Sequence, residues 1–255
     1  MKSNDIYSYI LDNKIPEKHW WFRVRNNLIY IVLKRILKFE EGENRNIFDV
    51  GSGYGQLFQI WQKFGHIYSI DNNKYFTSYQ KQHYKRAVIW NSDFPNKESF
   101  KYKYDLICMC DFLEHIKEPD QILESSYELL REKGSLLITV PVYKWMWADF
   151  DVVSGHIRRY SRNQLISEVE NFGFKCTYST YFITLLFPLA VITRKIINPI
   201  RKRNKNFLGL EFGYTGKFLN EILYHISNLE TKLIGKRMAM PFGLSILGIF
   251  QKNNN

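Results

Sequence analysis

Three glycines at alternate positions, behind an acidic residue, indicate chemistry more directly than any other group of residues in this sequence. The apolar run at residues 47–50 contains Asp49 and is followed by Gly51, Gly53 and Gly55. Glycine is needed where φ is positive or where a Cβ would collide with a bound molecule, and a helix that starts after such a turn offers backbone N–H groups to a ligand. The spacing differs from the G-x-G-x-x-G of a dinucleotide site. Asp49 would repel a phosphate but would suit a ligand that carries an ammonium and a sulfonium.

A second acid follows at the distance expected for a nucleoside site. Residues 66–71 form a short run of alternating apolar residues that ends at Asp71, 22 residues after Asp49. In Rossmann-type sites an acid at the tip of the second strand, roughly 20 residues on, receives ribose hydroxyls. The alternative is a solvated turn residue, because Asp71 is followed directly by Asn72 and Asn73.

The same rhythm of apolar runs and polar ends continues along the chain and predicts a buried parallel sheet. Two further strands end near Asp93 and at Asp111, and a helix and a fifth strand follow them. In chain order, we predict these four elements at residues 87–90, 104–110, 120–130 and 135–140. Lys133 and Gly134 are typical of a helix end, with a cation and then a glycine.

Five motifs in this order, between residues 47 and 141, resemble those of the class I S-adenosylmethionine-dependent methyltransferases. They are DVGSGYG, the acid of SID, the Asp of NSDF, YDLICMCDFLEHI and LLREKGSLLITVP. The resemblance covers more than half of the chain. It implies a Rossmann-like α/β fold with a seven-stranded sheet of order 3-2-1-4-5-7-6, whose last strand is antiparallel. Within that superfamily, HWWFRVR (19–25) and GHIRRYS (155–161) are similar to a bacterial branch often met among cell-surface glycan functions.

The resemblance also implies which residues hold S-adenosylmethionine. The expected cofactor-binding residues are Asp49, Gly51, Ser52, Gly53, Gly55, Asp71, Asn72, Asp93, Phe94, Asp111, Phe112 and Arg25. The glycine turn would take the amino-acid part, Asp71 the ribose, Asp93 with Phe94 the adenine, and Asp111 with Phe112 the far wall. Family members use an N-terminal helix as a lid, in which an arginine would meet the cofactor carboxylate. The aromatic residues beside that arginine could equally be core packing.

The predicted organisation is therefore a core with two helical additions. We expect an N-terminal helical lid at 1–45, a cofactor-binding core at 46–182, a helical insertion at 183–242 and the last strand with the tail at 243–255. In the family the last strand forms a hairpin with the sixth, here residues 174–181, so the insertion would be spliced into that hairpin. Such insertions commonly bind the methyl acceptor.

Two histidines are the candidates for catalysis. A methyl sulfonium is already activated, so the enzyme mainly aligns the reactants and removes water. A hydroxyl acceptor would also need a group that takes its proton. His115 follows the fourth strand, at the edge where open α/β sheets bind ligands, and His156 lies in a polar loop after the fifth strand. The alternatives are a helix-capping role for His115 and a structural role for His156.

Five further residues are candidates for acceptor binding. They are Trp145, Trp147, Arg158, Arg159 and Tyr160. The two tryptophans would line a pocket if the chain is extended there, or they are simply buried. The two arginines would hold a phosphate or carboxylate through their planar guanidinium groups, or they form a solvated basic turn.

A metal site is a separate alternative that we do not predict. Asp111, Glu114 and His115 form D-x-x-E-H, which is similar to the E-x-x-E-H that helps to hold a divalent cation in ubiquinone-type O-methyltransferases. Carboxylate oxygens suit hard cations, but aspartate at the first position shortens the reach.

Composition sets limits on location and partners. The formal net charge is +11 and 45% of the 255 residues are hydrophobic. No basic flank precedes an apolar core near the N-terminus, so we expect no signal peptide and a cytoplasmic protein. The uncharged segment 181–193 is too short to span a bilayer. The basic cluster 194–205 beside it favours a helix on an anionic membrane surface at the inner face of the cell membrane, or else a helical pair packed on the core or a twin subunit.

The function that we predict is O-methylation of a glycan, a lipid-linked molecule or another small-molecule acceptor. Methylation of RNA is the alternative that the net charge favours, but no N-P-P-Y-like motif follows the fourth strand and no appended RNA-binding module is visible, so we expect no nucleic-acid partner. A non-catalytic binding subunit is a further alternative, and the intact cofactor motifs argue against it. The sequence does not predict the oligomeric state.

Overall fold

A computed structural model describes residues 18–197 and 216–253. The chain forms two compact units. We call them the core unit (39–144, 155–180 and 245–255) and the helical unit (1–38, 145–154 and 181–244).

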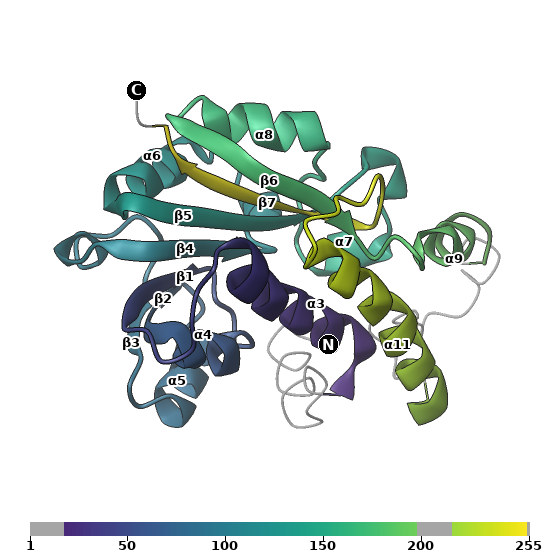
Figure 1. Cartoon of the computed structure of the whole chain (residues 1–255), viewed down its shortest axis with the longest axis horizontal. Helices are drawn as coiled ribbons and strands as arrows, with labels where there is room; N and C mark the ends of the chain where they lie inside the picture. Colours follow the sequence, from purple (N-terminus) through teal and green to yellow (C-terminus); the bar gives the residue numbers. More distant parts are fainter. Residues whose placement is uncertain (1–17, 198–215, 254–255) are drawn as a thin grey trace. The chain divides into compact units, whose positions relative to one another are not determined.

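The core unit is built on one seven-stranded sheet, drawn in Figure 1. The strands are β1 (Arg45–Val50), β2 (Gly65–Asp71), β3 (Val88–Asn91), β4 (Tyr104–Cys110), β5 (Leu130–Pro141), β6 (Phe174–Phe182) and β7 (Ser245–Lys252). Their order is β3-β2-β1-β4-β5-β7-β6, and β7 runs antiparallel to β5. The predicted fold is confirmed.

Helices cover this sheet, because parallel strands bury both of their faces. The core-unit helices are α4 (Phe58–Phe64), α5 (Lys74–His83), α6 (Asp120–Leu129) and α8 (Arg162–Glu170), with 3₁₀ turns η2 (Ser99–Lys101) and η3 (Leu113–His115). α4 packs on β2, α5 on β2 and β3, α6 on β5, and α8 on β7. Cys108 and Cys110 of β4 are buried free thiols.

The predicted start of the fifth strand was wrong. The helix ends at Leu129, one residue before the predicted end, but Lys133 and Gly134 do not close it, because Leu130 already pairs with Tyr104 of β4. β5 therefore begins five residues earlier than the predicted strand at 135–140, and its register with β4 shifts between Tyr104 and Leu106.

The other helices of the described residues lie in the helical unit. They are α3 (Trp20–Ile31), the π-helix η1 (Val32–Ile36), the 3₁₀ turn η4 (Lys144–Met146), α7 (Asp149–Val153), α9 (Phe187–Ile192), the π-helix η5 (Thr193–Ile197) and α11 (Lys217–Ile234). α3 packs along α11. Of the segment 181–193, Tyr181 and Phe182 belong to β6, and the helix begins only at Phe187, where α9 leads directly into η5. Among the described residues, no helix is both long and apolar enough to cross a bilayer.

The sheet brings the chemically interesting residues to one edge. β1, β2 and β4 are parallel, with Val50 opposite Ile70 and Phe48 opposite Ile107. The carboxyl ends of parallel strands meet at the same edge of a sheet. The segments after Val50, Asp71 and Cys110 therefore leave the sheet together.

Candidate active site

The glycine turn after β1 has the backbone that its sequence predicts. Gly51, Gly53 and Gly55 have φ values of 68°, 57° and 80°, in the left-handed region that disfavours other residues. A Cβ at Gly51 would lie only 2.1 Å from Cδ2 of Phe112. Glycine is thus required at position 51 both for its conformation and for the ring that packs on it.

The two acids at the ends of β1 and β2 are held differently. Asp49 is buried, and its Oδ2 accepts a hydrogen bond of 2.8 Å from the indole Nε1 of Trp61. Asp71 receives backbone N–H groups from Gly53 (2.9 Å, to Oδ2) and Asn73 (2.8 Å, to Oδ1). Burial raises the pKa of the Asp71 carboxyl, and these two hydrogen bonds oppose that rise. The carboxylate therefore ties the glycine turn to the start of α5.

A buried polar network beneath this turn was not predicted. Gln80 of α5 donates from Nε2 to Ser52 Oγ (2.8 Å) and to the carbonyl of Gly53, while Ser69 Oγ donates to Gln80 Oε1 (2.8 Å). Ser52 was predicted from its motif, but Gln80 has no sequence signal beyond its place in a helix. The network fixes the backbone of the glycine turn.

The predicted adenine-binding pair lies at the end of β3. Asp93 Oδ1 accepts a hydrogen bond of 2.9 Å from Asn72 Nδ2, so two of the predicted residues meet. Phe94 is buried, with its ring 5.4 Å from that of Phe48 in an edge-to-face contact. The carboxylate and amide lie at the surface, whereas the aromatic ring belongs to the core.

Asp111 starts the segment after β4 in an unusual conformation. Its φ is 56°, which costs a non-glycine residue about 1–2 kcal/mol. Thr139 of β5 stabilises it, because the Thr139 hydroxyl donates to Asp111 Oδ1 (3.1 Å) and its carbonyl accepts from the Asp111 N–H (2.9 Å). This turn directs Phe112 onto Gly51.

His115 and His156, predicted from motifs about 40 residues apart, lie side by side. Their ring centroids are 4.9 Å apart and the rings are nearly perpendicular. The loop of His156 is held against the segment after β4, since the N–H of Ile157 donates to the carbonyl of Glu114 (2.9 Å). The structure thus brings together both candidate catalytic residues.

The hydrogen bond of His115 assigns its tautomer. Nδ1 lies 3.2 Å from the carbonyl oxygen of Gly155, and a carbonyl can only accept, so Nδ1 carries the hydrogen and Nε2 of the neutral ring has the lone pair. Burial lowers the pKa of His115, and the neighbouring His156 lowers it further. The neutral ring therefore predominates at pH 7, and its Nε2 can accept a proton.

A buried carboxylate accompanies the two histidines. Glu114 is fully buried, and its Oε1 lies 3.9 Å from Nε2 of His156. Donor atoms of Glu114, His115 and His156 all lie within 4.8 Å of one another. The structure thus groups His156, rather than Asp111 of the alternative metal triad, with Glu114 and His115. Asp111 Oδ1 accepts from the Thr139 hydroxyl.

In the core unit, the side chains predicted to bind the acceptor are buried or donate hydrogen bonds to backbone carbonyls of the chain. Arg158 donates to the carbonyl of Lys117, and the buried Arg159 donates from Nη1 to the carbonyl of Val142 (3.0 Å). Tyr160 is buried, and burial raises its pKa. All three pin the loop that contains His156.

The remaining predicted residues belong to the helical unit. Arg25 is buried in α3, with its guanidinium 4.8 Å from the ring of Trp21. Trp145 and Trp147 are exposed, not buried. The ring of Trp145, which lies in η4 rather than in extended chain, meets that of Phe187 edge to face at 6.1 Å.

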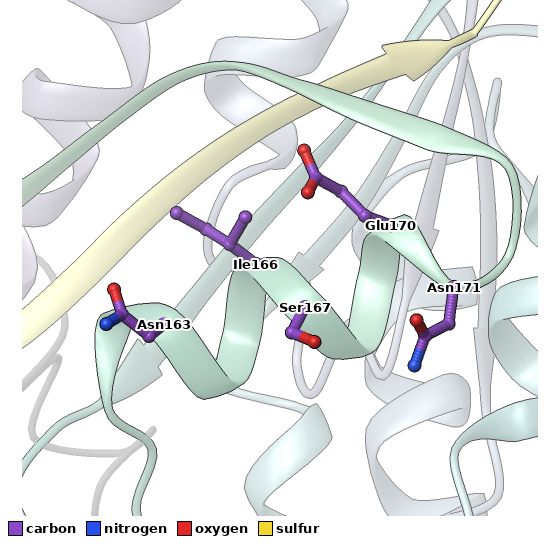
Figure 2. Close-up of a pocket in the computed structure, with 5 residues that line it drawn as sticks. All are labelled: Asn163, Ile166, Ser167, Glu170 and Asn171. Carbon is purple, nitrogen blue, oxygen red and sulfur yellow. The ribbon is translucent and has the colours of Figure 1, made fainter.

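A surface hollow lies elsewhere in the core unit. Figure 2 shows its lining residues on one face of α8: Asn163, Ile166, Ser167, Glu170 and Asn171. None of the predicted site residues lines it. We therefore place the candidate active site at the carboxyl edge of the sheet, where the chemistry is concentrated.

Comparisons with known proteins agree with this geometry. The family model of a methyltransferase domain matches residues 23–179. The ribosomal RNA small subunit methyltransferase A of Mycoplasmopsis pulmonis is 24% identical over 186 residues, which are 69% of this chain and 68% of that protein.

Two solved structures illustrate the shared fold. A putative sarcosine dimethylglycine methyltransferase from Galdieria sulphuraria is 15% identical, with a TM-score of 0.56 over 90% of this chain and 86% of that one. A SAM-dependent methyltransferase from Archaeoglobus fulgidus is also 15% identical, with a TM-score of 0.54 over 89% and 94% of the two chains. Because the family match spans well over half of its residues, this chain belongs to the methyltransferase-domain family as a class I enzyme that uses S-adenosylmethionine.

Proposed function

We propose that the enzyme methylates a hydroxyl group of a glycan or lipid-linked acceptor, with His115 taking the hydroxyl proton. The observation that carries this proposal is the tautomer of His115, whose Nδ1–H is committed to the carbonyl of Gly155. His115 lies three residues after Phe112, whose ring packs on Gly51 of the predicted cofactor turn. A neutral imidazole at this edge of the sheet suits an oxygen nucleophile, which must lose a proton.

The residues of the chain would divide the work as follows. S-adenosylmethionine, when bound, supplies a methyl group on a positively charged sulfur. The glycine turn and Asp71 would hold it, and Phe112 would exclude water from the transfer path. His115 would accept the hydroxyl proton at Nε2 as the oxygen gains the methyl group. The buried carboxylate of Glu114, next to His156, would stabilise the positive charge that then appears on the histidine pair.

Replacing His115 by asparagine or by glutamine offers a matched test of this role. In His115→Asn the amide nitrogen takes the place of Nδ1 and keeps the donor to Gly155, but Nε2 is lost. We expect kcat to fall by about 10²–10⁴-fold, the usual contribution of a general base, while the affinity for S-adenosylmethionine and the melting temperature stay unchanged. His115→Gln, whose amide reaches the position of Nε2 without basicity, should be equally inactive. Full activity in either variant would contradict the proposal.

The pH profile gives an independent readout. Burial lowers the pKa of His115 from its ordinary value of 6.5, so the neutral form grows as pH rises through that lowered pKa and predominates at pH 7. The rate should therefore fall on the acid side of pH 6.5, and this limb should vanish from the residual activity of His115→Asn.

The assay would follow tritiated methyl groups from the cofactor into lipid and glycan extracts of cell envelopes. Transfer into neither extract would refute the acceptor class.

RNA is a second candidate acceptor, because the curated relative methylates ribosomal RNA by its name. The net charge of +11 also suits a polyanion. The same tritium assay with total RNA would detect this activity. If RNA is the methyl acceptor, its binding should weaken steeply with added salt.

A further inference from the structure

α11 buries its polar side and exposes an apolar one, the reverse of an ordinary amphipathic helix. Its buried residues are Asn220, Leu223, Ser227, Glu230, Thr231 and Ile234. Its exposed large apolar residues are Phe218, Leu219, Ile222, Leu229 and Leu233. Two questions follow: what holds the polar face inside, and what the exposed apolar face contacts.

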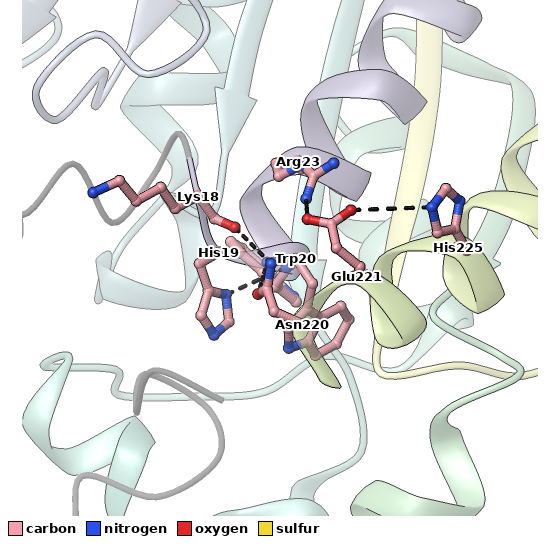
Figure 3. Close-up of polar contacts among 8 residues, drawn as sticks. Lys18, His19, Trp20, Arg23, Asn220, Glu221 and His225 are labelled. Atoms are coloured by element: carbon pink, nitrogen blue, oxygen red, sulfur yellow. Dashed lines mark hydrogen bonds and ion pairs between the residues drawn. The ribbon is translucent and has the colours of Figure 1, made fainter. Parts of the chain in front are cut away.

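The buried face is held by hydrogen bonds to α3, as Figure 3 shows. Asn220 Oδ1 accepts from the N–H of Trp20 (2.8 Å), and its Nδ2 donates to the carbonyl of Lys18 (2.8 Å). Arg23 forms an ion pair with Glu221, and Asn27 donates to Asn228. Polar contacts, rather than apolar burial, therefore fix how this helix is turned.

Near the other end of α11, Glu230 also fixes the orientation of the helix through hydrogen bonds. Its carboxylate accepts the backbone N–H groups of Ile183, Thr184 (2.8 Å) and Leu185 (3.2 Å), just after β6. Burial raises the pKa of Glu230, and these hydrogen bonds oppose the rise. A rotation that hid the apolar face would break this cradle, so the apolar face stays outside.

The outward residues form one stripe. Phe218, Ile222, Leu229 and Leu233 are 81%, 37%, 57% and 39% exposed. At about 100° per residue these positions lie within roughly 60° around the helix axis, and they extend over about 22 Å along it. We call these four residues the apolar stripe.

The helical unit that contains the apolar stripe is rich in positive charge, and three exposed lysines lie on α11 or just after it. The described residues of the helical unit contain 12 Lys and Arg but 4 Asp and Glu, whereas the core unit contains 18 and 17. Two of the four acids in the helical unit, Asp151 and Glu230, are buried. Lys217, Lys232 and Lys236, at or just beyond the ends of α11, are exposed.

We propose that α11 docks the enzyme on an anionic lipid surface. An apolar stripe with lysines beside it is the pattern of a helix that lies in the plane of a bilayer interface, with its apolar side among the upper acyl chains and its cations at the headgroup phosphates. A second copy of this chain fits less well, because it would bring two positively charged units together. Docking of this kind would serve a glycan or lipid-linked acceptor and does not depend on His115.

Vesicle co-sedimentation of the full chain tests this assignment. We expect binding to vesicles of phosphatidylglycerol with phosphatidylcholine, at least about tenfold weaker binding to phosphatidylcholine alone, and weaker binding as salt is added. The double variant Phe218→Ser/Leu229→Ser should lose about tenfold or more in affinity. Phe100→Ser, which removes an exposed ring of the core unit, is the matched control and should bind as the unchanged protein does.

A charge-reversed pair guards against loss of folding in the stripe variant. Lys232→Glu/Lys236→Glu should also weaken binding to anionic vesicles, while Lys81→Glu/Lys175→Glu in the core unit should not. Equal binding to neutral and anionic vesicles, or unchanged binding in both helical-unit variants, would overturn the assignment. So would a concentration-dependent dimer that the stripe variant abolishes in the absence of lipid. Cofactor affinity, measured by calorimetry in every variant, separates these outcomes from failure of the proposed catalytic function.

Discussion

At the scale of single residues, Gly51 connects sequence, backbone and cofactor site most directly. Its φ of 68° and the 2.1 Å approach of a Cβ to the Phe112 ring are separate obstacles to any side chain. We predict that Gly51→Ala weakens S-adenosylmethionine binding at least about tenfold, since the ring and the turn must move apart. Isothermal calorimetry would measure the affinity and thermal unfolding the stability.

Gly42 is the matched control for that substitution. Its φ is 86°, but a Cβ there would meet no atom within 4 Å. Gly42→Ala should therefore cost only the left-handed conformation, about 1–2 kcal/mol, with cofactor affinity unchanged. If the two variants bind the cofactor equally well, the contact between Gly51 and Phe112 does not shape the site.

At the scale of elements, the start of α3 predicts a pH-dependent stability. His19 is the N-cap, and its Nδ1 accepts the N–H of Trp21 (3.3 Å). Burial lowers the pKa of His19 from 6.5 to about 4. A histidine whose folded pKa is depressed stabilises the protein fully above pH 6.5, and this contribution is lost as pH falls towards 4, for a total of about 3 kcal/mol.

Asparagine in place of His19 isolates this effect. It is a favourable N-cap that accepts the same N–H but does not titrate. Denaturant unfolding at pH 7 and pH 5 should show a smaller loss of stability in His19→Asn than in the unchanged protein. An identical loss in both would mean that other groups govern the acid limb.

Local pattern predicts some elements of this fold and misses others for identifiable reasons. The strand ends at Val50 and Asp71 follow from short-range periodicity and from glycine, which act within a few residues. The early start of β5 depends on the pairing of Leu130 with Tyr104, a contact between distant segments. The buried face of α11 is set by hydrogen bonds to α3, which no local pattern specifies.

The candidate site shows the same division. Motif position identified His115 and His156 separately, but their contact depends on a loop that backbone hydrogen bonds hold in place. Gln80 was missed because a buried glutamine in a helix has no motif of its own. Arg159 and Tyr160 have the composition of a ligand site, yet they are buried within their own loop.

At the scale of the whole molecule, most of the positive net charge belongs to the helical unit. The core unit is nearly neutral, with 18 Lys and Arg against 17 Asp and Glu, although it contains the candidate active site. RNA methylation requires a strand to be held at that site, and phosphate contacts supply most of such affinity. The charge distribution therefore predicts RNA binding that is weak, non-specific and unrelated to methyl transfer.

Filter binding of a single-stranded RNA at two salt concentrations tests this prediction. Lys232→Glu/Lys236→Glu should lower the RNA affinity and flatten its dependence on salt, because each phosphate contact on a single strand adds about 0.7 to the salt slope. Lys81→Glu/Lys175→Glu should change neither, since the core unit offers no excess of cations. The tritium assay on the same RNA should show no methyl transfer. One result would contradict the prediction: methyl transfer to RNA that is lost in Lys81→Glu/Lys175→Glu but kept in Lys232→Glu/Lys236→Glu. That result would mean that the core unit binds the RNA strand.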